Sequence, residues 1–248
     1  MLRSLIRPVI RPVRRLIRQL GYDVVAYVPA THTDARMHWL RALDIGLVVD
    51  VGANEGQFVG WMRDRGYAGQ VISYEPQAAA FAACSRRWGG DPRWAGVRKA
   101  LGEAAGELDL HVAGNSVSSS ILPMLERHVA ALPESAIVAR ERIEIARLDE
   151  ELVRLKVDRS SIFLKIDAQG FELPILRGAR ERLADVALLE MELSLVPLYE
   201  GQELLPQVCA EVGALGFTPI WIEQGFSETK TPRMLQVDGL FVKADRLL

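Results

Sequence analysis

Short apolar runs alternate with longer helical stretches from Leu47 onward, and this alternation limits the fold more than any other feature of the chain. Runs such as LVVDV at 47–51 and SIFLKID at 161–167 predict buried strands. The alanine-rich stretch at 77–88 predicts one of the helices between them. Strands that are joined by crossovers pair in parallel. The sequence therefore predicts an α/β fold.

The last two predicted strands, at 217–223 and 237–242, follow one another without a helix and should pair antiparallel at the sheet edge. Doubly wound sheets bind ligands beyond the carboxyl ends of their strands, so the residues that end each run are the candidates for chemistry. The segment at 123–155 is expected to be mostly helical or irregular, with a short strand around 142–146. The other expected elements are strands at 47–51, 70–75, 94–99, 107–112, 161–167 and 186–193 and helices at 77–88 and 204–215.

Composition excludes several classes of protein. Of the 248 residues, 49% are apolar and 25% are charged, which is typical of a globular chain with a sizeable core rather than of a disordered or fibrous one. Cys84 and Cys209 lie far apart without a CxxC or Cys/His cluster, which excludes a disulfide framework and a zinc ribbon. We expect both cysteines to be buried, reduced thiols.

The first twenty residues hold six arginines and no acid, which leaves 24 basic and 32 acidic residues elsewhere, a formal charge of −8. An acidic body argues against nucleic-acid binding. Apolar residues recur at helical spacing between the arginines, as in a helix that lies in a membrane interface, although Pro8 and Pro12 would kink it. Packing against the rest of the chain or a partner subunit is the simpler alternative. The arginines argue against a secretory signal and exclude a membrane span here. We expect an extension at 1–30 and one domain at 31–248.

The first strand ends in a turn with two glycines. Gly52 allows the backbone to turn tightly and approach a ligand, and Gly56 lets the following helix pack close to the strand. A dinucleotide fingerprint would have GxGxxG, whereas Ala53 and Asn54 separate these glycines and provide a poorer cradle for pyrophosphate. Asp50 would repel phosphate but can receive the ammonium group of an amino-acid moiety. This favours S-adenosylmethionine over NAD.

The ends of the next two strands also fit a nucleoside. The second ends in Glu75 and Pro76, and a carboxylate there can accept two hydrogen bonds from a ribose diol. Such a carboxylate is common to nicotinamide and adenosylmethionine sites, so it does not indicate which of the two cofactors binds. Ala100 and Leu101 follow the third strand, where small and apolar groups can flank an adenine ring.

These motifs together resemble the FkbM-type methyltransferases. The resemblance implies a Rossmann-like class I methyltransferase fold, an α/β fold with a seven-stranded, mostly parallel sheet and an antiparallel edge strand. It also implies an S-adenosylmethionine-dependent O-methyltransferase that acts on a hydroxyl of a sugar, glycolipid or other secondary-metabolite acceptor. The matching segments, in order between about Leu47 and Val242, are DVGANEGQ, YEP, KALGEAAGELDLHV, NSVSSS, RLDEEL, FLKIDAQGFELPILRGA and LLEMELSLVPLYEGQ.

The resemblance also implies where the cofactor binds. It places the turn after the first strand at the methionine part, Glu75 at the ribose and the 100–101 region at the adenine. The family's KIDxQGxE motif matches at 165–172, at the tip of the fourth strand facing the methyl group. The residues expected to bind the cofactor are Asp50, Gly52, Ala53, Asn54, Gly56, Glu75, Pro76, Ala100, Leu101, Asp167 and Gln169.

A sugar hydroxyl is a poor nucleophile because its pKa lies far above neutrality, so some group must take its proton. Asp167 is the first candidate base and Glu172 the second. A divalent ion is the alternative, because it would lower the pKa of the acceptor hydroxyl and orient it. Asp167, Glu190 and Glu192 would offer the hard oxygen ligands that Mg²⁺ prefers. A hydrogen-bonding role that fixes the loop is the alternative for the carboxylates of Asp167 and Glu172.

The acceptor has four candidate contacts. Tyr199 can stack on a sugar face and Glu200 can bind its hydroxyls, although a turn with a buried tyrosine is equally compatible with this segment. Ser119 belongs to a polar loop at 114–120 near the adenosine or acceptor entrance by family analogy, although such loops are usually solvated turns. Among the dispersed histidines, His128 lies in a stretch expected to cover the active site.

Two other functions stay open. A nicotinamide-dependent oxidoreductase on a Rossmann-like sheet would lack its GxGxxG turn and a Tyr-x-x-x-Lys pair here. A non-catalytic binding module of the same fold would not need Asp50, Glu75 and Asp167 at its strand ends. The expected partners are a small-molecule, sugar or glycolipid acceptor and no nucleic acid. We expect a cytoplasmic protein. Two further points stay open: peripheral contact of residues 1–20 with the inner membrane surface, and assembly into a homo-oligomer.

Overall fold

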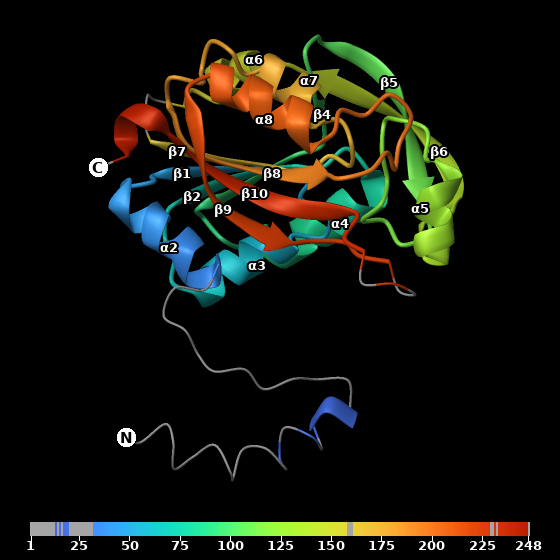
Figure 1. Ribbon diagram of the computed structural model, residues 1–248. Helices are drawn as coiled ribbons and strands as arrows, with labels where there is room; N and C mark the ends of the chain where they lie inside the picture. The colour runs from blue at the N-terminus through green and yellow to red at the C-terminus, as the bar shows by residue number, and fades with distance from the viewer. Residues whose placement is uncertain are drawn as a thin grey trace. The chain divides into compact units, whose positions relative to one another are not determined.

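The computed structural model describes residues 13, 15, 17–19, 32–157, 161–228, 231 and 233–247 (Figure 1). The chain divides into two compact units, residues 1–34 and 35–248, and every described strand belongs to the second. The predicted amphipathic segment at 1–20 lies mostly outside the described residues, which include helical positions at 13, 15 and 17–19.

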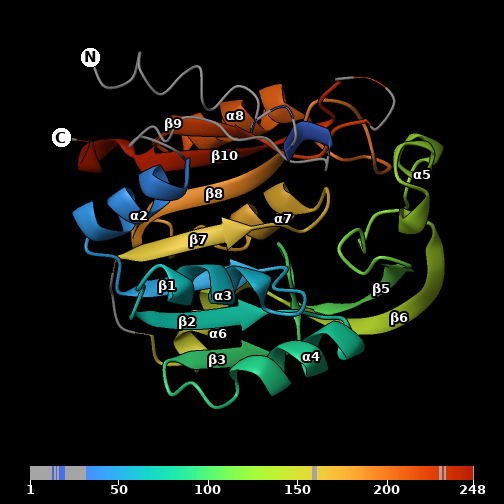
Figure 2. The same cartoon turned by 90° about the horizontal axis from the view of Figure 1, so that it is seen from below.

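A seven-stranded sheet forms the centre of the second unit. Its strands are β1 (Leu47–Val51), β2 (Gln70–Tyr74), β3 (Trp94–Val97), β7 (Ile162–Ile166), β8 (Val186–Ser194), β9 (Phe217–Gln224) and β10 (Gln236–Lys243). They lie in the order β3-β2-β1-β7-β8-β10-β9 (Figure 2). The first five in the chain pair in parallel, and β10 runs antiparallel to both β8 and β9. The predicted mostly parallel α/β sheet with an antiparallel pair at one edge is confirmed, and the reversed strand is β10.

Helices cover both faces of this sheet, as Figure 1 shows. On one face lie α2 (His32–Ala42), α3 (Gln57–Asp64) and α4 (Ala78–Trp88), and on the other lie α6 (Leu148–Arg154), α7 (Glu172–Arg177) and α8 (Leu205–Ala214). In β1 the side chains alternate between these two cores: Val49 and Val51 pack with α6 and α7, and Val48 packs with α2 and α3. Burial on both faces explains why the parallel strands are almost continuously apolar in sequence.

A second sheet of three strands was predicted only in part. It consists of β4 (Ala100–Leu101), β5 (Gly106–Ala113) and β6 (Ile137–Ala146), and it lies beyond the carboxyl ends of the parallel strands (Figure 2). The helical or irregular assignment of 123–155 is confirmed at α5 (Glu126–Ala131) and wrong for the first half of β6. The first four residues of β6 are exposed, so the alternation of apolar and polar residues that marks a half-buried strand is missing there.

A buried ion pair joins α2 to the sheet. Arg36 donates from Nε and Nη2 to the two carboxylate oxygens of Glu190 on β8, at 2.6 and 2.5 Å. The guanidinium also lies over the Trp61 ring, 4.7 Å from its centroid. Arg36 is 8% and Glu190 5% exposed. Removal of one partner of such a pair leaves a buried charge without compensation.

We expect Arg36→Met to lower the free energy of unfolding by about 3–5 kcal/mol, because Glu190 would remain buried without its cation. Urea unfolding followed by circular dichroism measures the change. Arg41→Met is the control, because Arg41 lies on the same helix and is exposed. This control should change the free energy of unfolding by less than about 0.5 kcal/mol. Equal losses in the two variants would contradict the role given to the ion pair.

Candidate functional site

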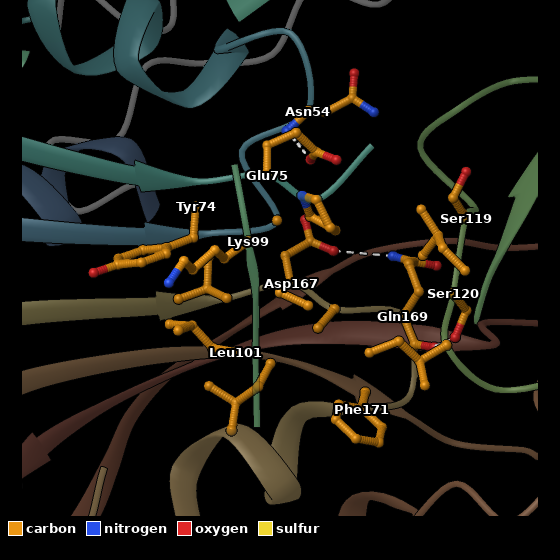
Figure 3. Close-up of a pocket in the computed structure, with 18 of the residues that line it drawn as sticks. Asn54, Tyr74, Glu75, Lys99, Leu101, Ser119, Ser120, Asp167, Gln169 and Phe171 are labelled. Carbon is orange, nitrogen blue, oxygen red and sulfur yellow. Dashed lines mark hydrogen bonds between the residues drawn. The ribbon is translucent and has the colours of Figure 1, made fainter. Parts of the chain in front are cut away.

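A pocket opens at the carboxyl ends of β1, β2 and β7, where a doubly wound sheet binds its ligands (Figure 3). The space between its walls is about 680 Å³ and is continuous with solvent. The predicted site residues that line it are Gly52, Asn54, Glu75, Pro76, Ala100, Leu101, Ser119, Asp167 and Gln169.

The turn after β1 is built from left-handed backbone. Gly52, Asn54 and Gly56 have φ values of 79°, 47° and 79°. A Cβ at Gly52 would stand 1.9 Å from the carbonyl oxygen of Asp167, so this turn touches the loop after β7 directly. A Cβ at Gly56 would stand 2.6 Å from the indole of Trp88 on α4. Glycine at 52 therefore permits the close approach to the loop after β7, and glycine at 56 permits the close packing against α4. Ala53 and Gly56 themselves do not line the pocket.

Glu75 links the turn after β1 to the end of β2. Its carboxylate accepts the backbone N–H of Asn54 at 2.8 Å and that of Gln77 at 2.8 Å, one on each oxygen. Burial raises the pKa of Glu75 to about 7, against the lowering effect of these two bonds. Each carboxylate oxygen has a second lone pair, so Glu75 retains the capacity to accept the two hydroxyls of a ribose.

Asp50, which is predicted to receive the ammonium group of the cofactor, does not line the pocket. Its side chain is fully buried on the face of the sheet that α3 covers, 3.4 Å from the ammonium of Lys165. Ser73 donates a hydrogen bond to its other oxygen at 3.4 Å. Burial raises the pKa of Asp50, and the nearby Lys165 opposes this shift. The cation that Asp50 meets here is thus a lysine of the neighbouring strand instead of a ligand ammonium.

Asp167 lies where β7 ends, at the pocket wall, and its side chain is 40% exposed. Its Oδ1 accepts a hydrogen bond from Nε2 of Gln169 at 2.9 Å, as Figure 3 shows. Its Oδ2 lies 3.4 Å from the ammonium of Lys165. The carboxylate is therefore both accessible from the pocket and held from two sides.

Glu172 lies behind the loop instead of in the pocket. Its Oε1 accepts the backbone N–H groups of Ala168 and Gly170 at 3.2 and 2.9 Å, which closes the loop between β7 and α7. Burial raises the pKa of Glu172 to about 7. Gln169 and Gly170 both have positive φ, 52° and 96°, at the turn that Glu172 closes. This geometry matches the loop-fixing alternative considered for Glu172.

The predicted magnesium ligands are not brought together. Glu190 is held by Arg36, and Glu192 accepts hydrogen bonds on Oε2 from Nε2 of Gln169 and of Gln236 at 2.8 and 2.6 Å. Within the described part of the chain, no group of three His, Cys, Asp or Glu side chains is arranged to hold a metal ion. In this structure Asp167, Glu190 and Glu192 therefore form no ligand group, because each carboxylate is bound by a neighbouring side chain.

Two of the predicted acceptor contacts are buried. Tyr199 is fully buried, with its hydroxyl 2.9 Å from Oε1 of Gln169 and 3.0 Å from the carbonyl of Ser118. His128 packs edge-on against Tyr199 with 5.2 Å between ring centroids, and burial lowers the pKa of His128 to about 4. Neither ring is presented to a ligand, so the alternative of a turn with a buried tyrosine applies. Glu200 is exposed at this turn.

Several residues that line the pocket are not marked by any sequence pattern. The loop at 116–121 forms one wall. The hydrogen bonds that join it to its surroundings include one from Nδ2 of Asn54 to Oγ of Ser116 at 3.1 Å and one from Oγ of Ser120 to the carbonyl of Gln169 at 2.7 Å. Its sequence is polar, as expected for a loop, but polarity alone does not indicate which way a loop folds. The lining residues that were not predicted are Val51, Tyr74, Lys99, Leu110, Ser116, Val117, Ser120, Ile121, Ala168, Phe171 and Ile175.

The site combines three features that suit a nucleoside. A glycine turn after β1 allows close approach, the buried carboxylate of Glu75 ends β2, and apolar side chains such as Leu101 and Phe171 line the wall (Figure 3). A parallel sheet with these features at its carboxyl edge defines a nucleoside-binding α/β protein. Residues 50–219 match the family described as Methyltransferase FkbM domain, which is more than half of the chain. The chain belongs to this family, as the resemblance predicted, and has the fold of a class I S-adenosylmethionine-dependent methyltransferase.

A comparison with curated proteins gave no match. Among solved structures, the chain is similar to an rRNA methylase from Streptococcus thermophilus, with 10% identity over 89% of this chain and 99% of that one and a TM-score of 0.46. It is also similar to magnesium protoporphyrin IX methyltransferase from Synechocystis PCC 6803 with bound SAM (9% identity, 85% and 77% coverage, TM-score 0.44). A SAM-dependent methyltransferase from Aquifex aeolicus gives 13% identity, 85% and 89% coverage and a TM-score of 0.42. Identities and TM-scores this low say nothing about the substrate of this chain.

Glu75 should make the stability of the cofactor-free protein depend on pH. Its pKa of about 7 lies above the ordinary value of 4.5, so the folded state holds the proton more tightly than the unfolded chain. The stability that this group contributes is present below pH 4.5 and is lost as the pH rises from 4.5 to 7. Between about pH 5 and 8 we expect the wild type to lose about 2–3 kcal/mol more free energy of unfolding than Glu75→Gln.

Urea unfolding at a series of pH values measures this difference. Glu200→Gln is the matched control, because Glu200 is exposed and its removal should leave the pH dependence unchanged. Parallel curves for the wild type and Glu75→Gln would contradict the raised pKa of Glu75.

Proposed function

We propose that this protein is an O-methyltransferase that transfers the methyl group of S-adenosylmethionine to a hydroxyl of a sugar, glycolipid or other secondary-metabolite acceptor. Membership of the FkbM family supports the methyl donor. The observation that carries the proposal is the carboxylate of Asp167, which lies at the pocket wall with 40% of its side chain exposed. A hydroxyl acceptor needs such a base, because its own pKa lies far above neutrality.

The pocket fits the cofactor on observations of its own residues. Gly52 lines the pocket and has no Cβ, so the turn after β1 can lie directly against the loop after β7 at the pocket wall. Glu75 is proposed to accept the ribose hydroxyls, with Pro76 beside it. Ala100 and Leu101 are proposed to flank the adenine. When bound, S-adenosylmethionine supplies an electrophilic methyl group on a sulfonium.

Asp167 is proposed as the general base. It would take the hydroxyl proton as the acceptor oxygen bonds to the methyl carbon and the carbon–sulfur bond breaks, with the neutral thioether as leaving group. Much of the rate would come from holding the two reacting atoms at near-attack distance. The ammonium of Lys165 lies 3.4 Å from Oδ2 of Asp167 and helps to orient this carboxylate. Glu172 is proposed to fix the loop that carries Asp167, because it accepts two backbone hydrogen bonds from this loop.

The acceptor is proposed to enter beside the loop at 116–121 and the turn after β8. Ser119 lines the pocket, and Glu200 is exposed at this turn, so both offer polar groups for acceptor hydroxyls. Tyr199 and His128 are proposed to support the turn from below. The formal charge of −8 outside the first twenty residues favours a small hydroxylated acceptor over a nucleic acid.

A methyl-transfer screen tests this proposal. Donor labelled in the methyl group would be offered to hydroxylated sugars, glycolipids and polyketides, with an RNA oligonucleotide as a separate arm. We expect the label on an acceptor oxygen, and in this assay we expect Asp167→Asn to lower kcat by about 100-fold or more. The dissociation constant of S-adenosylhomocysteine, measured by calorimetry, should stay within about threefold, because the substitution keeps the size and hydrogen-bonding reach of the side chain.

Asp64→Asn is the control for this variant, because Asp64 is exposed at the end of α3. Near-normal turnover in Asp167→Asn would place the base elsewhere. Label on the RNA alone, or binding of NADH in place of S-adenosylhomocysteine, would contradict the proposed function.

In the described residues, no helix is both long enough and apolar enough to cross a membrane. We propose peripheral contact of residues 1–20 with an anionic membrane surface, on the evidence of their six arginines and interspersed apolar residues. Deletion of residues 1–20 should lower cosedimentation with phosphatidylserine vesicles by about tenfold at low salt and leave S-adenosylhomocysteine affinity unchanged. Phosphatidylcholine vesicles are the control. Equal cosedimentation of the full-length chain and the chain without residues 1–20 would contradict the membrane contact.

A further inference from the structure

Gln169 lies between two carboxylates at the side of the pocket proposed for the acceptor. Its Nε2 donates to Oδ1 of Asp167 at 2.9 Å and to Oε2 of Glu192 at 2.8 Å. An amide nitrogen carries two N–H groups, so each carboxylate receives one of them. The amide oxygen of Gln169 lies 2.9 Å from the hydroxyl of Tyr199. The orientation of this amide is therefore set from both of its ends.

Further hydrogen bonds connect this amide to the turn after β8. Glu192 Oε2 also accepts a bond from Nε2 of Gln236 at 2.6 Å, and Gln236 Nε2 lies 3.4 Å from Oγ of Ser194. Gln202 donates to the same Ser194 hydroxyl at 2.8 Å, and its Oε1 accepts the backbone N–H of Tyr199 at 2.7 Å. The network thus begins and ends at Tyr199, and it links β8 and β10 to the loop that carries Asp167.

The backbone at Gln169 indicates that this placement is specific. Its φ of 52° lies in the left-handed region, which an L side chain occupies at a cost of roughly 1–2 kcal/mol. The hydrogen bond from Ser120 to its carbonyl, at 2.7 Å, holds the strained residue in place. Strain of this kind persists only where the surroundings determine the conformation, and such places cluster at functional sites.

The bonds of Gln169 leave its side chain poorly suited to the cofactor-binding role predicted from the sequence. Both of its N–H groups are taken by carboxylates of the protein. Burial, together with the charge of Asp167, raises the pKa of Glu192 well above its ordinary value. A neutral Glu192 avoids the repulsion that two charged carboxylates on one amide would experience.

We propose that Gln169 is a positioning residue, which holds the Asp167 carboxylate in a single orientation toward the acceptor and is itself held by Tyr199 and Glu192. The inference rests on the proposed function, in which Asp167 takes the acceptor proton. Each oxygen of Asp167 keeps a lone pair outside the bonds to Gln169 and Lys165, and that lone pair can receive this proton. A displacement of about 1 Å in a catalytic group can cost about 100-fold in rate, so a fixed carboxylate matters.

Two variants of the full chain test this inference. Gln169→Asn keeps an amide and a residue that tolerates positive φ, but it is one methylene shorter and cannot reach both carboxylates. Tyr199→Phe removes only the hydroxyl that faces Oε1 of Gln169. Gln224→Asn is the matched control, because the side chain of Gln224 makes an exposed hydrogen bond to Ser227 and neither lines the pocket nor takes part in this network. Thermal unfolding verifies that each variant is folded.

The first measurement needs no acceptor. In crystal structures with S-adenosylhomocysteine, we expect the Asp167 carboxylate of Gln169→Asn to move by about 1 Å or to divide between conformers. In Tyr199→Phe we expect a smaller displacement, and in Gln224→Asn none. The dissociation constant of S-adenosylhomocysteine, measured by calorimetry, should stay within about threefold in all three variants. An unmoved Asp167 in Gln169→Asn would overturn the inference.

The second measurement is turnover of a hydroxylated acceptor from the screen. We expect kcat to fall about 30- to 100-fold in Gln169→Asn and about fivefold in Tyr199→Phe, with KM for the acceptor nearly unchanged. A tenfold weaker affinity for S-adenosylhomocysteine with unchanged kcat would overturn the inference and make Gln169 a cofactor ligand. If the wild type and Gln224→Asn both fail to methylate any hydroxyl, the proposed function fails, and the displacement of Asp167 still decides whether Gln169 positions it.

Discussion

The ammonium of Lys165 is the charge on which the rest of the site depends. It lies 3.4 Å from Asp50 on the neighbouring strand and 3.4 Å from Asp167 at the end of its own strand. Burial lowers the pKa of Lys165, but the charges of Asp167 and Asp50 raise it more, so the pKa lies above its ordinary value. A buried carboxylate such as Asp50 would be very costly without this cation. One lysine thereby compensates the buried carboxylate of Asp50 inside the sheet and orients the carboxylate of Asp167, which faces the pocket.

Parallel pairing of β1 with β7 is what makes this arrangement compact. The register sets Asp50 beside Lys165, and two residues further along each chain segment the turn after β1 meets the loop after β7. There Gly52 approaches the carbonyl of Asp167 so closely that any side chain would collide with it. The residues proposed for the cofactor and those proposed for the acceptor therefore share one contact, and a shift of either loop would move the other.

The sequence predicted the sheet better than it predicted the side chains. Continuous apolar runs mark strands buried on both faces, so β1 was predicted with its observed bounds. The first half of β6 lacks such a pattern because it is exposed. Glycine at position 52 and a carboxylate at 75 follow from their places at strand ends, and both line the pocket.

The residues that were misplaced share one cause. Their partners come from segments that only the tertiary fold brings close. Glu190 pairs with Arg36, which is 154 positions away in the sequence, and Tyr199 reaches the carbonyl of Ser118, which is 81 positions away. Asp50 is adjacent to residues that face the other core, and only the register with β7 shows that Lys165 is opposite it. Local spacing contains no information on these contacts.

The hydrogen bond between Asn54 and Ser116 has a consequence for how a bound nucleoside would leave. The loop at 116–121 forms one wall of the pocket, and this bond fastens it to the turn after β1. Any outward swing of the loop must break that bond together with the one from Ser120 to Gln169. A cofactor exchange that required this loop to open would therefore loosen the residue beside Asp167 at the same time, and the reactive arrangement would have to form again around each new cofactor molecule.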